Sequence, residues 1–527
     1  MPSRPSEPPV QHIVVAGGGT AGWMTALLLT TSTFGARLKV TVLDAAEAPI
    51  VGAAEGSTPW LRGLFDSLGI DESEWMPTCD ATYKCGTTFD GWSTRPGCER
   101  FFEPFPSTLD KITQAHFLRN VHARLGGADV HAHPDRFCLS QRVAVEGRAP
   151  HPAREFPFDI GYGYHVDGAR LAAFLQARAL QRGVAHVARR LQAATLDEHG
   201  DLRALQLEGG DSLAADLFID CTGPDALLIG QALKRPFVSY ADALSNDAIV
   251  TLAVPHGDGP LMSQTVATAL RHGWASSLPL ASRLELGYVY SSAHASADAA
   301  ETELRARLGG LDAAMPAHHS TLRAGRHARH WHRNCVAIGA AQGSVEPLQA
   351  TALESVQRAA ASLVDVLERG DLGESARAAF NDGLNARADG VRDLIVARYK
   401  TSTRTDTDYW RANAANNALS DRLQALLRTW MSAQPIAPGI DSGSFGIGGT
   451  LQSWYSLLAG VGLFPEVDPA RRESGGDLDG IDDLIRRGAL NFPDQRAWLR
   501  DIPPHADRLD LWRSPIASGR RATLGAL

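Results

Sequence analysis

The segment Ile13–Met24, IVVAGGGTAGWM, constrains the fold more than any other part of the chain. Four apolar residues run directly into a glycine turn with the spacing GxGxxG, and the apolar run Leu27–Leu29 follows. This order is typical of a strand, a tight turn and a helix that packs on a sheet. Gly17 permits the turn, Gly19 lets the backbone approach a pyrophosphate, and Gly22 allows close helix–strand packing. The segment predicts an α/β fold of the Rossmann type that binds a dinucleotide.

A second apolar strand supports this prediction. The segment Leu38–Leu43 ends in Asp44, at the spacing expected for a carboxylate that binds a ribose hydroxyl. The helix that starts near Thr20 and Ala21 presents free N–H groups and the positive end of its dipole to the phosphates. An ordinary βαβ turn without a ligand is the alternative.

Size and charge restrict the class of protein. The 527 residues exceed one simple core, so two domains or one large composite domain are expected. The formal net charge of −8 leaves no broad basic surface, which argues against nucleic acid as a partner. No apolar run reaches the roughly 18 residues of a membrane span, and the polar, proline-rich start lacks the apolar region of a signal peptide. We therefore expect a cytoplasmic protein without a membrane contact.

Cysteine and histidine give no metal signature. The six cysteines are scattered without CxxC spacing, which argues against a zinc site and against a disulfide framework. The segment Arg326–His332, RHARHWH, contains three histidines, but no carboxylate or cysteine stands beside them at ligand spacing. We predict no metal and interpret this segment as a solvated connector before the next strand.

Segments far apart in the chain are predicted to share the nucleotide-binding sheet. Asp216–Gly223 and Cys335–Gly339 are typical of short buried strands that end in a glycine turn. Tyr162–Leu180 contains a helix that Asp167 could cap. After Pro347 the pattern becomes helical, and one apolar stripe stops at Gly370. The chain is therefore predicted to begin with an interrupted α/β domain.

Five segments in chain order resemble motifs of the flavin-dependent tryptophan halogenases. They are GGGTAGW at 17–23, VGAAEGSTP at 51–59, the KxGxxFxxW pattern at 84–92, DCTG at 220–223 and WHRNCVAIG at 331–339. The resemblance extends from Ile13 to Pro465. The chain is identified as a divergent member of that family.

The resemblance implies a cofactor and its partners. FAD would be reduced by a separate flavin reductase and would form a flavin hydroperoxide with oxygen. A halide ion, chloride or bromide, would attack it, and the resulting hypohalous acid would reach an aromatic substrate past a lysine. The implied FAD contacts are Gly17, Gly19, Thr20, Ala21, Gly22, Asp44, Ala54, Glu55, Gly339, Glu346, Pro347, Leu348 and Ala352. Residues 1–370 would form the FAD-binding domain with interleaved substrate-pocket segments, and residues 371–527 a mainly helical region packed on it.

Lys84 matches the lysine of the family. It lies in Tyr83–Phe89, a predicted strand, where lysine is depleted. An ammonium there can donate hydrogen bonds to the oxygen of hypohalous acid or be transiently halogenated, and burial makes its charge state tunable. The alternative is a surface lysine that extends its ammonium into water.

Two family motifs are altered on the catalytic side. The WxWxIP segment, expected at the substrate pocket, reads Trp274 to Pro279, with Ser276 in place of the second Trp, a pair that is usually taken to suppress ordinary monooxygenation. Ser276 could also merely leave room for a larger neighbour. The EPLESTG segment reads EPLQATA, so the catalytic Glu is replaced by Gln349, and an amide cannot act as a base. Halide is expected at the backbone N–H groups of Thr351 and Ala352, near a helix N-terminus.

The substrate wall is altered as well. The family segment FYHPF reads Phe101 to Phe105, so Phe105 remains as an aromatic wall and Glu103 replaces the His. A carboxylate can accept a hydrogen bond, pair with a cation, or take over the role of the base. We expect a halogenase for an electron-rich aromatic other than free tryptophan: an indole, a pyrrole, a phenol or a peptide-borne ring. The alternatives are a non-halogenating flavin monooxygenase or oxidase and a non-catalytic flavin-binding protein. A homodimer is left open.

Overall fold

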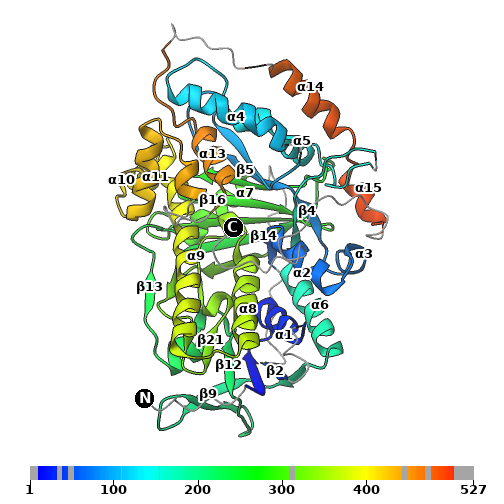
Figure 1. Cartoon of the computed structure of the whole chain (residues 1–527), viewed down its shortest axis with the longest axis vertical. Helices are drawn as coiled ribbons and strands as arrows, with labels where there is room; N and C mark the ends of the chain where they lie inside the picture. Colours follow the sequence, from blue (N-terminus) through cyan, green and yellow to red (C-terminus); the bar gives the residue numbers. More distant parts are fainter. Residues whose placement is uncertain are drawn as a thin grey trace.

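The computed structural model describes residues 10–31, 38–45, 53–108, 110–153, 155–307, 315–441, 449–468, 476 and 478–503. Two large sheets carry the fold, with helices packed on them (Figure 1). The first sheet lies at the lower end of the molecule in this view, and the second lies above it.

The first sheet has the strand order β20-β21-β12-β1-β2-β8. Its strands are β1 (His12–Ala16), β2 (Lys39–Asp44), β8 (Ala185–Ala188), β12 (Leu217–Asp220), β20 (Trp331–His332) and β21 (Cys335–Ala337). All neighbouring pairs are parallel except β20 with β21. Segments separated by hundreds of residues therefore share one sheet, and the predicted Rossmann-type α/β fold is confirmed.

Alternate residues of β1 pack on opposite faces of this sheet. Ile13 and Val15 join the apolar cluster of three helices, whereas Val14 and Ala16 join a cluster with a small antiparallel sheet. The helices are α1 (Thr20–Thr31), α6 (Gly168–Gln181) and α8 (Ala352–Arg369); the small sheet is β9 (Leu191–Leu196), β10 (Leu202–Leu207) and β11 (Ser212–Leu213). As predicted, Asp167 caps α6 by accepting from the Arg170 N–H, and α8 ends at Gly370.

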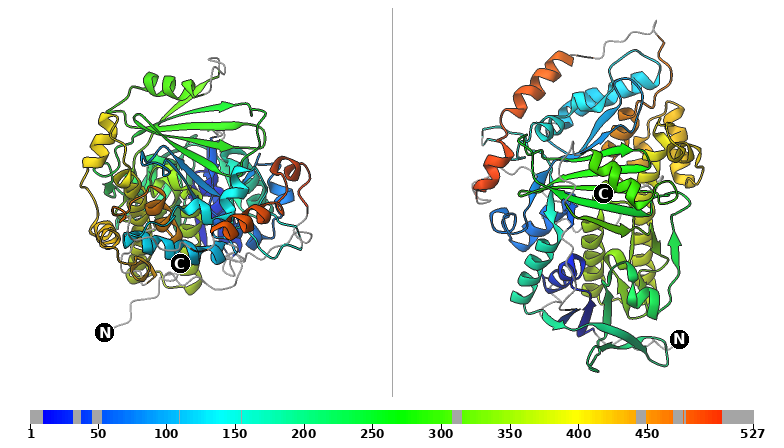
Figure 2. Two further views of the ribbon diagram at one scale, coloured as in Figure 1. Left: turned by 90° about the horizontal axis from the view of Figure 1, so that it is seen from above. Right: turned by 180° about the vertical axis from the view of Figure 1, so that it is seen from behind.

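The second sheet has seven strands in the order β18-β14-β17-β16-β15-β5-β6. They are β5 (Gly86–Asp90), β6 (Arg100–Pro104), β14 (Ala248–Val254), β15 (Thr265–Leu270), β16 (Gly273–Pro279), β17 (Leu284–Tyr290) and β18 (Ala317–Thr321). Its strands are antiparallel except for the parallel pair of β15 with β5. Figure 2 shows this sheet from behind, with α7 (Ala297–Ala306) beside it.

Two further three-stranded sheets link these parts. One has the order β3-β7-β4 and consists of β3 (Ala54–Gly56), β7 (Gly163–Asp167) and β4 (Thr82–Lys84). The other has the order β13-β19-β22 and consists of β13 (Phe237–Ser239), β19 (Gly325–His327) and β22 (Gly343–Ser344).

The remaining helices pack around both large sheets and on one another. The longest is α9 (Glu374–Thr401), which packs on α8 and on β20 (Figure 1). The others are α2 (Trp60–Leu68), α3 (Glu72–Trp75), α4 (Asp110–Leu125), α5 (Leu139–Val145), α10 (Asp408–Ala415), α11 (Asp421–Met431), α12 (Ala437–Asp441), α13 (Leu451–Gly460), α14 (Leu478–Ala489) and α15 (Gln495–Arg500). One apolar cluster combines Phe89 and Phe101 with Leu394 and Trp454, from both sides of position 370. A domain division at residue 370 stays a prediction.

The structure corrects the interpretation of Arg326–His332 as a solvated connector. Its residues form β19 and β20, and the side chains of His327 and His330 are buried. The His330 backbone N–H donates to Asn381 Oδ1 at 2.7 Å, and its ring nitrogen Nε2 lies 3.0 Å from Asn385 Oδ1. Both asparagines belong to α9, and this long-range packing removes His330 from water.

The predicted strand Tyr83–Phe89 is divided at Cys85. Lys84 ends β4 in the small sheet, and Gly86 begins β5 in the large one. The Cys85 N–H donates to the Ser263 carbonyl oxygen at 2.7 Å, and the Phe105 N–H donates to the Cys85 carbonyl oxygen at 2.9 Å. Lys84 therefore lies at the junction of two sheets.

Candidate functional site

The glycine turn leaves one open position in front of α1. A Cβ on Gly17 would lie 2.1 Å from the Cys221 carbonyl oxygen, and one on Gly22 would lie 1.8 Å from the Gly17 oxygen. Protein packing therefore requires glycine at both positions. A Cβ on Gly19, in contrast, meets nothing within 4 Å. This cradle beside the first N–H groups of α1, at Thr20 and Ala21, fits the pyrophosphate of a dinucleotide.

The fold brings other predicted FAD contacts to the same turn. A Cβ on Gly18 would meet the Asp44 carboxylate at 2.3 Å, and one on Gly339 would lie 2.8 Å from the Ala21 Cβ. Thr20 Oγ1 donates to the Gly168 carbonyl oxygen at 3.2 Å. A Cβ on Gly168 would in turn lie 2.8 Å from Glu55 Oε1. The residues therefore surround one cradle that fits FAD, although Val51 and Gly52 of the second motif lie outside the described residues.

The neighbours Ala54 and Glu55 have different surroundings. Burial raises the pKa of the Glu55 carboxyl to about 7. The Ala54 N–H donates to Glu285 Oε1 at 2.8 Å, and Glu285 in turn pairs with Arg283 at 3.2 Å. The backbone of Ala54 is thus occupied by the protein, whereas the Glu55 carboxyl can pass between its charged and neutral forms near neutral pH.

Gly19→Val is expected to abolish FAD binding without unfolding the chain. The added Cβ would enter the open cradle, where no protein atom lies within 4 Å of it. Equilibrium titration of the purified variant with FAD measures the loss, and the thermal unfolding midpoint without FAD checks the fold. Gly22→Val is the matched control, because there the added side chain collides with the protein itself. Unchanged FAD affinity in Gly19→Val would contradict the dinucleotide assignment.

Lys84 is joined to the glycine-turn region by the sheet β3-β7-β4. Glu55 and Gly56 pair with Val166 and His165 of β7, and Lys84 pairs with Gly163 of the same strand. The Lys84 side chain is 1% exposed, so the alternative of a surface lysine is wrong. A Cβ on Gly56 would lie 3.3 Å from Lys84 Nζ and 3.2 Å from the Ala350 Cβ. The ammonium therefore reaches the turn that contains the altered EPLESTG motif.

The surroundings of Lys84 tune its charge. Burial lowers the pKa of the ammonium to about 7, and the nearby Glu103 carboxylate partly offsets this effect. Nζ also lies 5.6 Å from the centroid of the Phe105 ring. Phe105, predicted as an aromatic wall, is half-buried. The amine can therefore exist in both protonation states near neutral pH.

A buried histidine beside Lys84 was missed by the sequence reasoning. His165 Nδ1 lies 3.1 Å from Thr82 Oγ1, and Nε2 lies 2.9 Å from Thr265 Oγ1. Burial, with a smaller contribution from Lys84, holds the pKa of His165 well below its usual range. His165 is therefore neutral, and one of the two hydroxyls must accept from its ring N–H. The local signal is a histidine inside the fully buried strand β7.

Glu103 and Gln349 converge on an arginine that the sequence reasoning also missed. Arg398 of α9 is 1% exposed, donates from Nη2 to Glu103 Oε2, and places Cζ 3.8 Å from the centroid of the Phe89 ring. With the Gln349 amide oriented to satisfy its neighbours, the Gln349 oxygen accepts from Arg398 Nε at 2.7 Å and from Nη2 at 2.5 Å. Of the roles open to Glu103, the structure contains two: it accepts a hydrogen bond and pairs with a cation. The signal was an arginine within the apolar helical run Leu394–Tyr399.

Buried hydrogen bonds of the Glu346 carboxylate hold the turn from Glu346 to Ala352 in place. Glu346 is buried, and its Oε2 accepts from Tyr399 OH at 2.6 Å, from Trp274 Nε1 at 2.8 Å and from Asn246 Nδ2 at 3.0 Å. Burial raises the pKa of this carboxyl. The Glu346 side chain therefore fastens the turn to β16 and α9.

The same turn presents backbone N–H groups at the start of α8. Leu348 is buried, whereas Pro347 is exposed. Ala350 adopts a left-handed φ of 54°, Thr351 is the N-cap without a side-chain cap, and Ala352 begins the helix. Ala352 has ordinary helical backbone, so glycine is not required there. The positive end of α8 remains a suitable halide position.

Trp274 and Ser276 both lie on β16 but contact different parts of the structure. The Trp274 side chain is buried in the main apolar cluster and donates to Glu346, so it supports the turn, and its place in the substrate pocket stays a prediction. Ser276 pairs with Ala267 and Gly287 on the neighbouring strands. These strand partners are small, and the interpretation that Ser276 leaves room for a larger neighbour stays a prediction.

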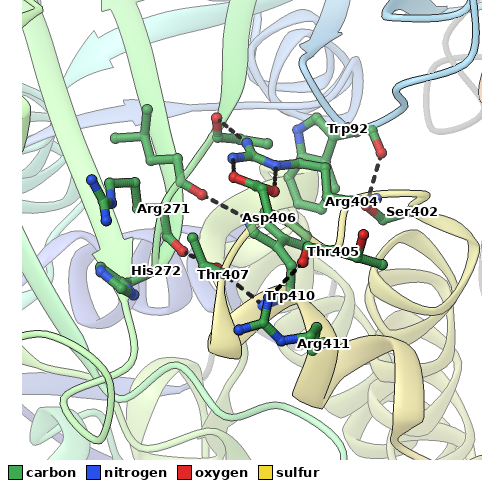
Figure 3. A network of polar contacts seen from close by, with 12 residues as sticks. Trp92, Arg271, His272, Ser402, Arg404, Thr405, Asp406, Thr407, Trp410 and Arg411 are labelled. Atoms are coloured by element: carbon green, nitrogen blue, oxygen red, sulfur yellow. Dashed lines mark hydrogen bonds and ion pairs between the residues drawn. The ribbon is translucent and has the colours of Figure 1, made fainter.

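The segment after α9 fixes that helix, and hence Arg398, to the second sheet (Figure 3). Ser402 Oγ donates to the Trp92 carbonyl oxygen at 2.8 Å, and Thr407 Oγ1 donates to the Arg271 carbonyl oxygen at 2.7 Å. Arg404 pairs with Asp406 at 2.7 Å. The Thr407 bond holds the loop on the turn between β15 and β16, and the Ser402 bond holds it on the segment after β5.

The described ranges contain neither a membrane-spanning helix nor a cluster of metal ligands. Within them, no helix is long and apolar enough to cross a membrane. Nor do three or more His, Cys, Asp or Glu side chains of these ranges form a group that could hold a metal ion. The six cysteines are all unpaired thiols, five of them buried.

The family model for tryptophan halogenases matches residues 12–474. The chain belongs to this family. Tryptophan 6-halogenase SttH of Streptomyces toxytricini is 34% identical over 92% of this chain and 96% of its own length. Tryptophan 7-halogenase RebH of Lentzea aerocolonigenes is 32% identical over 88% of this chain and 91% of its own length. The near-equal identities mean that family membership does not select a position on the substrate ring.

Solved structures of the family have the same fold. The crystal structure of SttH superposes with a TM-score of 0.83 at 31% identity and covers 94% of this chain and 100% of that one. BrvH, a flavin-dependent halogenase from Brevundimonas sp. BAL3, gives a TM-score of 0.80 at 28% identity over 94% of this chain and 99% of that one. The family's fold therefore extends over nearly the whole chain.

Proposed function

We propose that the protein is an FADH2-dependent halogenase of an electron-rich aromatic compound other than free tryptophan. Enzymes of this family use FAD reduced by a separate flavin reductase and require a halide ion. Bound FADH2 would supply, with oxygen and halide, the hypohalous acid. The observation that carries the proposal is the fully buried Lys84, which lies beside Gly56 and the Glu346–Ala352 turn.

Lys84 acts on the hypohalous acid. Its ammonium donates a hydrogen bond to the oxygen, which makes the oxygen a better leaving group. The ring carbon attacks the halogen, so a carbon–halogen bond forms while the halogen–oxygen bond breaks. The departing hydroxide takes the lysine proton and leaves as water. The ring then loses its own proton, which returns the charge to the amine through solvent.

The residues opposite Lys84 disfavour free tryptophan. Gln349 carries no negative charge to stabilise a cationic ring and cannot accept its proton. The Glu103 carboxylate, which stands where the family has a His that clamps indole, is paired with Arg398. An activated ring loses its proton readily and depends less on a base. Phe105 supplies the remaining aromatic surface of the pocket.

The test is a product assay with reduced FAD. The protein receives FADH2 from an added flavin reductase, oxygen, bromide and a panel of indoles, pyrroles and phenols, and products are analysed by mass spectrometry. A bromine isotope pattern that depends on active protein supports the proposal. Addition of oxygen without bromine would instead identify a monooxygenase, and peroxide as the sole product would identify a protein that only binds flavin.

The halogenation step is expected to slow as the pH rises through about 7, where the buried Lys84 loses its proton. Rates of product formation between pH 6 and 9, with FADH2 held in excess, measure this. A rate that rises over this range would contradict the ammonium role and favour a transiently halogenated neutral amine. Folding should show the opposite sign: between about 7 and 10.5 the unfolded chain holds the proton and the folded chain does not, so stability rises with pH.

Three further properties concern the flavin reductase, the cellular location and the oligomeric state. We infer that the reductase supplies FADH2 by diffusion or transient contact, since the site needs only the reduced cofactor. A cytoplasmic location and a homodimer stay predictions.

A further inference from the structure

The five N–H donors of Arg398 do not all have hydrogen-bond partners. The Nε and Nη2 edge faces the oxygen of Gln349, and Nη2 also reaches Glu103. The face of the guanidinium lies on the Phe89 ring. No described residue accepts from Nη1, which is buried. The cation is therefore held in one orientation and directs its strongest contacts at a carboxylate and an amide oxygen.

Gln349 is the member of this group that reaches the open side. Arg398 is 1% and Glu103 is 9% exposed, whereas Gln349 is partly exposed, as is Phe105. Because the guanidinium binds the amide oxygen, the Gln349 NH2 group turns toward hydrogen-bond acceptors. Position 349 thus presents a donor where a glutamate would present an acceptor.

The negative charges around the Gln349 NH2 group are paired or buried, whereas Lys84 adds a positive charge. The negative charge of Glu103 is compensated by Arg398, and the Glu346 carboxyl is buried under the turn. Lys84 contributes a positive charge when protonated. The side chains placed here therefore favour electron-rich oxygen in the substrate and give no stabilisation to a cationic indole intermediate.

We propose that the substrate is a phenol whose oxygen accepts a hydrogen bond from the Gln349 NH2 group. The inference rests on the proposed function and specifies its substrate class. When the ring carbon of a phenol attacks the halogen, the oxygen releases its own proton to water and a neutral dienone forms. Hydroxide leaves as water with the Lys84 proton, and the dienone loses its ring proton to solvent. Solvent then returns one proton to the phenolate oxygen and one to the Lys84 amine. Phenol and hypohalous acid give halophenol and water, and no carboxylate base is needed.

The experiment is a competition between 4-ethylphenol and 3-methylindole in one reaction. The enzyme receives FADH2, oxygen and bromide, and the ratio of brominated phenol to brominated indole is measured. Reagent hypobromous acid on the same mixture provides the reference ratio. Within one mixture, both products come from the same active fraction of enzyme. The wild-type ratio should exceed the reference by about tenfold, the effect of one well-placed hydrogen bond.

Variants at position 349 test the donor itself. Gln349→Leu keeps the Arg398–Glu103 pair but lacks the NH2 group, so the ratio should fall to the reference. Gln349→Glu should lower it at least as far, because a carboxylate repels a phenolate and stabilises a cationic indole. Gln181→Glu makes the same change at an exposed position beside Arg178 and should leave the ratio unchanged.

Three results would overturn the inference: a wild-type ratio equal to the reference, a preference for the indole, or an undiminished phenol preference in Gln349→Leu. The wild-type comparison is decisive even if a variant fails to fold. Absence of bromine from every product is a different failure, because it refutes the proposed function as a whole.

Discussion

Lys84→Ala is expected to remove halogenated product while FAD binding and the reoxidation of FADH2 continue at wild-type levels. Lys84 Nζ lies beside Gly56 and Phe105 rather than at the glycine turn, so its loss should separate the two half-reactions. Loss of a positioned proton donor typically lowers the rate by about 10²–10⁴-fold. Stopped-flow absorbance follows reoxidation, and mass spectrometry quantifies the product in the same samples.

A matched set of variants makes this result specific. Lys84→Met fills the same volume without a charge, so it should lose halogenation as well and remain folded, because burial of the ammonium opposes its charged form. Lys111→Ala removes an exposed lysine of α4 and should behave as wild type. Wild-type rates of halogenation in Lys84→Met would show that the lysine is structural, and the proposed mechanism would then fail.

Glu103→Gln is expected to destabilise the protein by about 3–5 kcal/mol, the usual effect of leaving one member of a buried ion pair alone. Arg398 is fully buried, and its contacts are with Glu103, the Gln349 oxygen and the Phe89 ring. Adding Gln349→Glu to the same chain restores a carboxylate at the Nε and Nη2 edge. The double variant should therefore recover most of the lost stability.

Urea unfolding of the wild type, both single variants and the double variant gives the coupling energy between positions 103 and 349. We expect about 2 kcal/mol or more in favour of one carboxylate at the pair of positions. A double variant no more stable than Glu103→Gln would contradict the shared role of Arg398. The same proteins decide where a base resides. If Gln349→Glu gives no gain on an indole while a folded Glu103→Gln loses all product, the base is Glu103.

The glycine-turn elements were predictable from sequence because local rules govern them. The turn with Gly17 and Gly22 follows from backbone sterics: any side chain there would collide with the adjacent strand or turn. The cap at Asp167 and the end of α8 at Gly370 follow from unpaired backbone groups within a few residues. Lys84 was conspicuous because a lysine inside a strand is uncommon.

Contacts between distant segments could not be predicted in this way. Glu103 and Arg398 are separated by 295 positions, and no local pattern links a carboxylate on a strand to a guanidinium on a helix. The burial of His330 depends on asparagines of α9, about which the RHARHWH segment carries no information. The strand neighbours of Ser276 are Ala267 of β15 and Gly287 of β17, and its own segment carries no information about them.

By itself, then, the sequence determined the Rossmann-type cradle and the family, since these depend on spacing within short segments. The tertiary structure decided the electrostatics of the pocket. It buried Lys84 and so lowered its pKa, paired Glu103 with Arg398, and turned Gln349 into a donor. The physical reason is that desolvation and charge pairing depend on which side chains converge in space, and convergence over hundreds of residues is set by the packing of the whole fold.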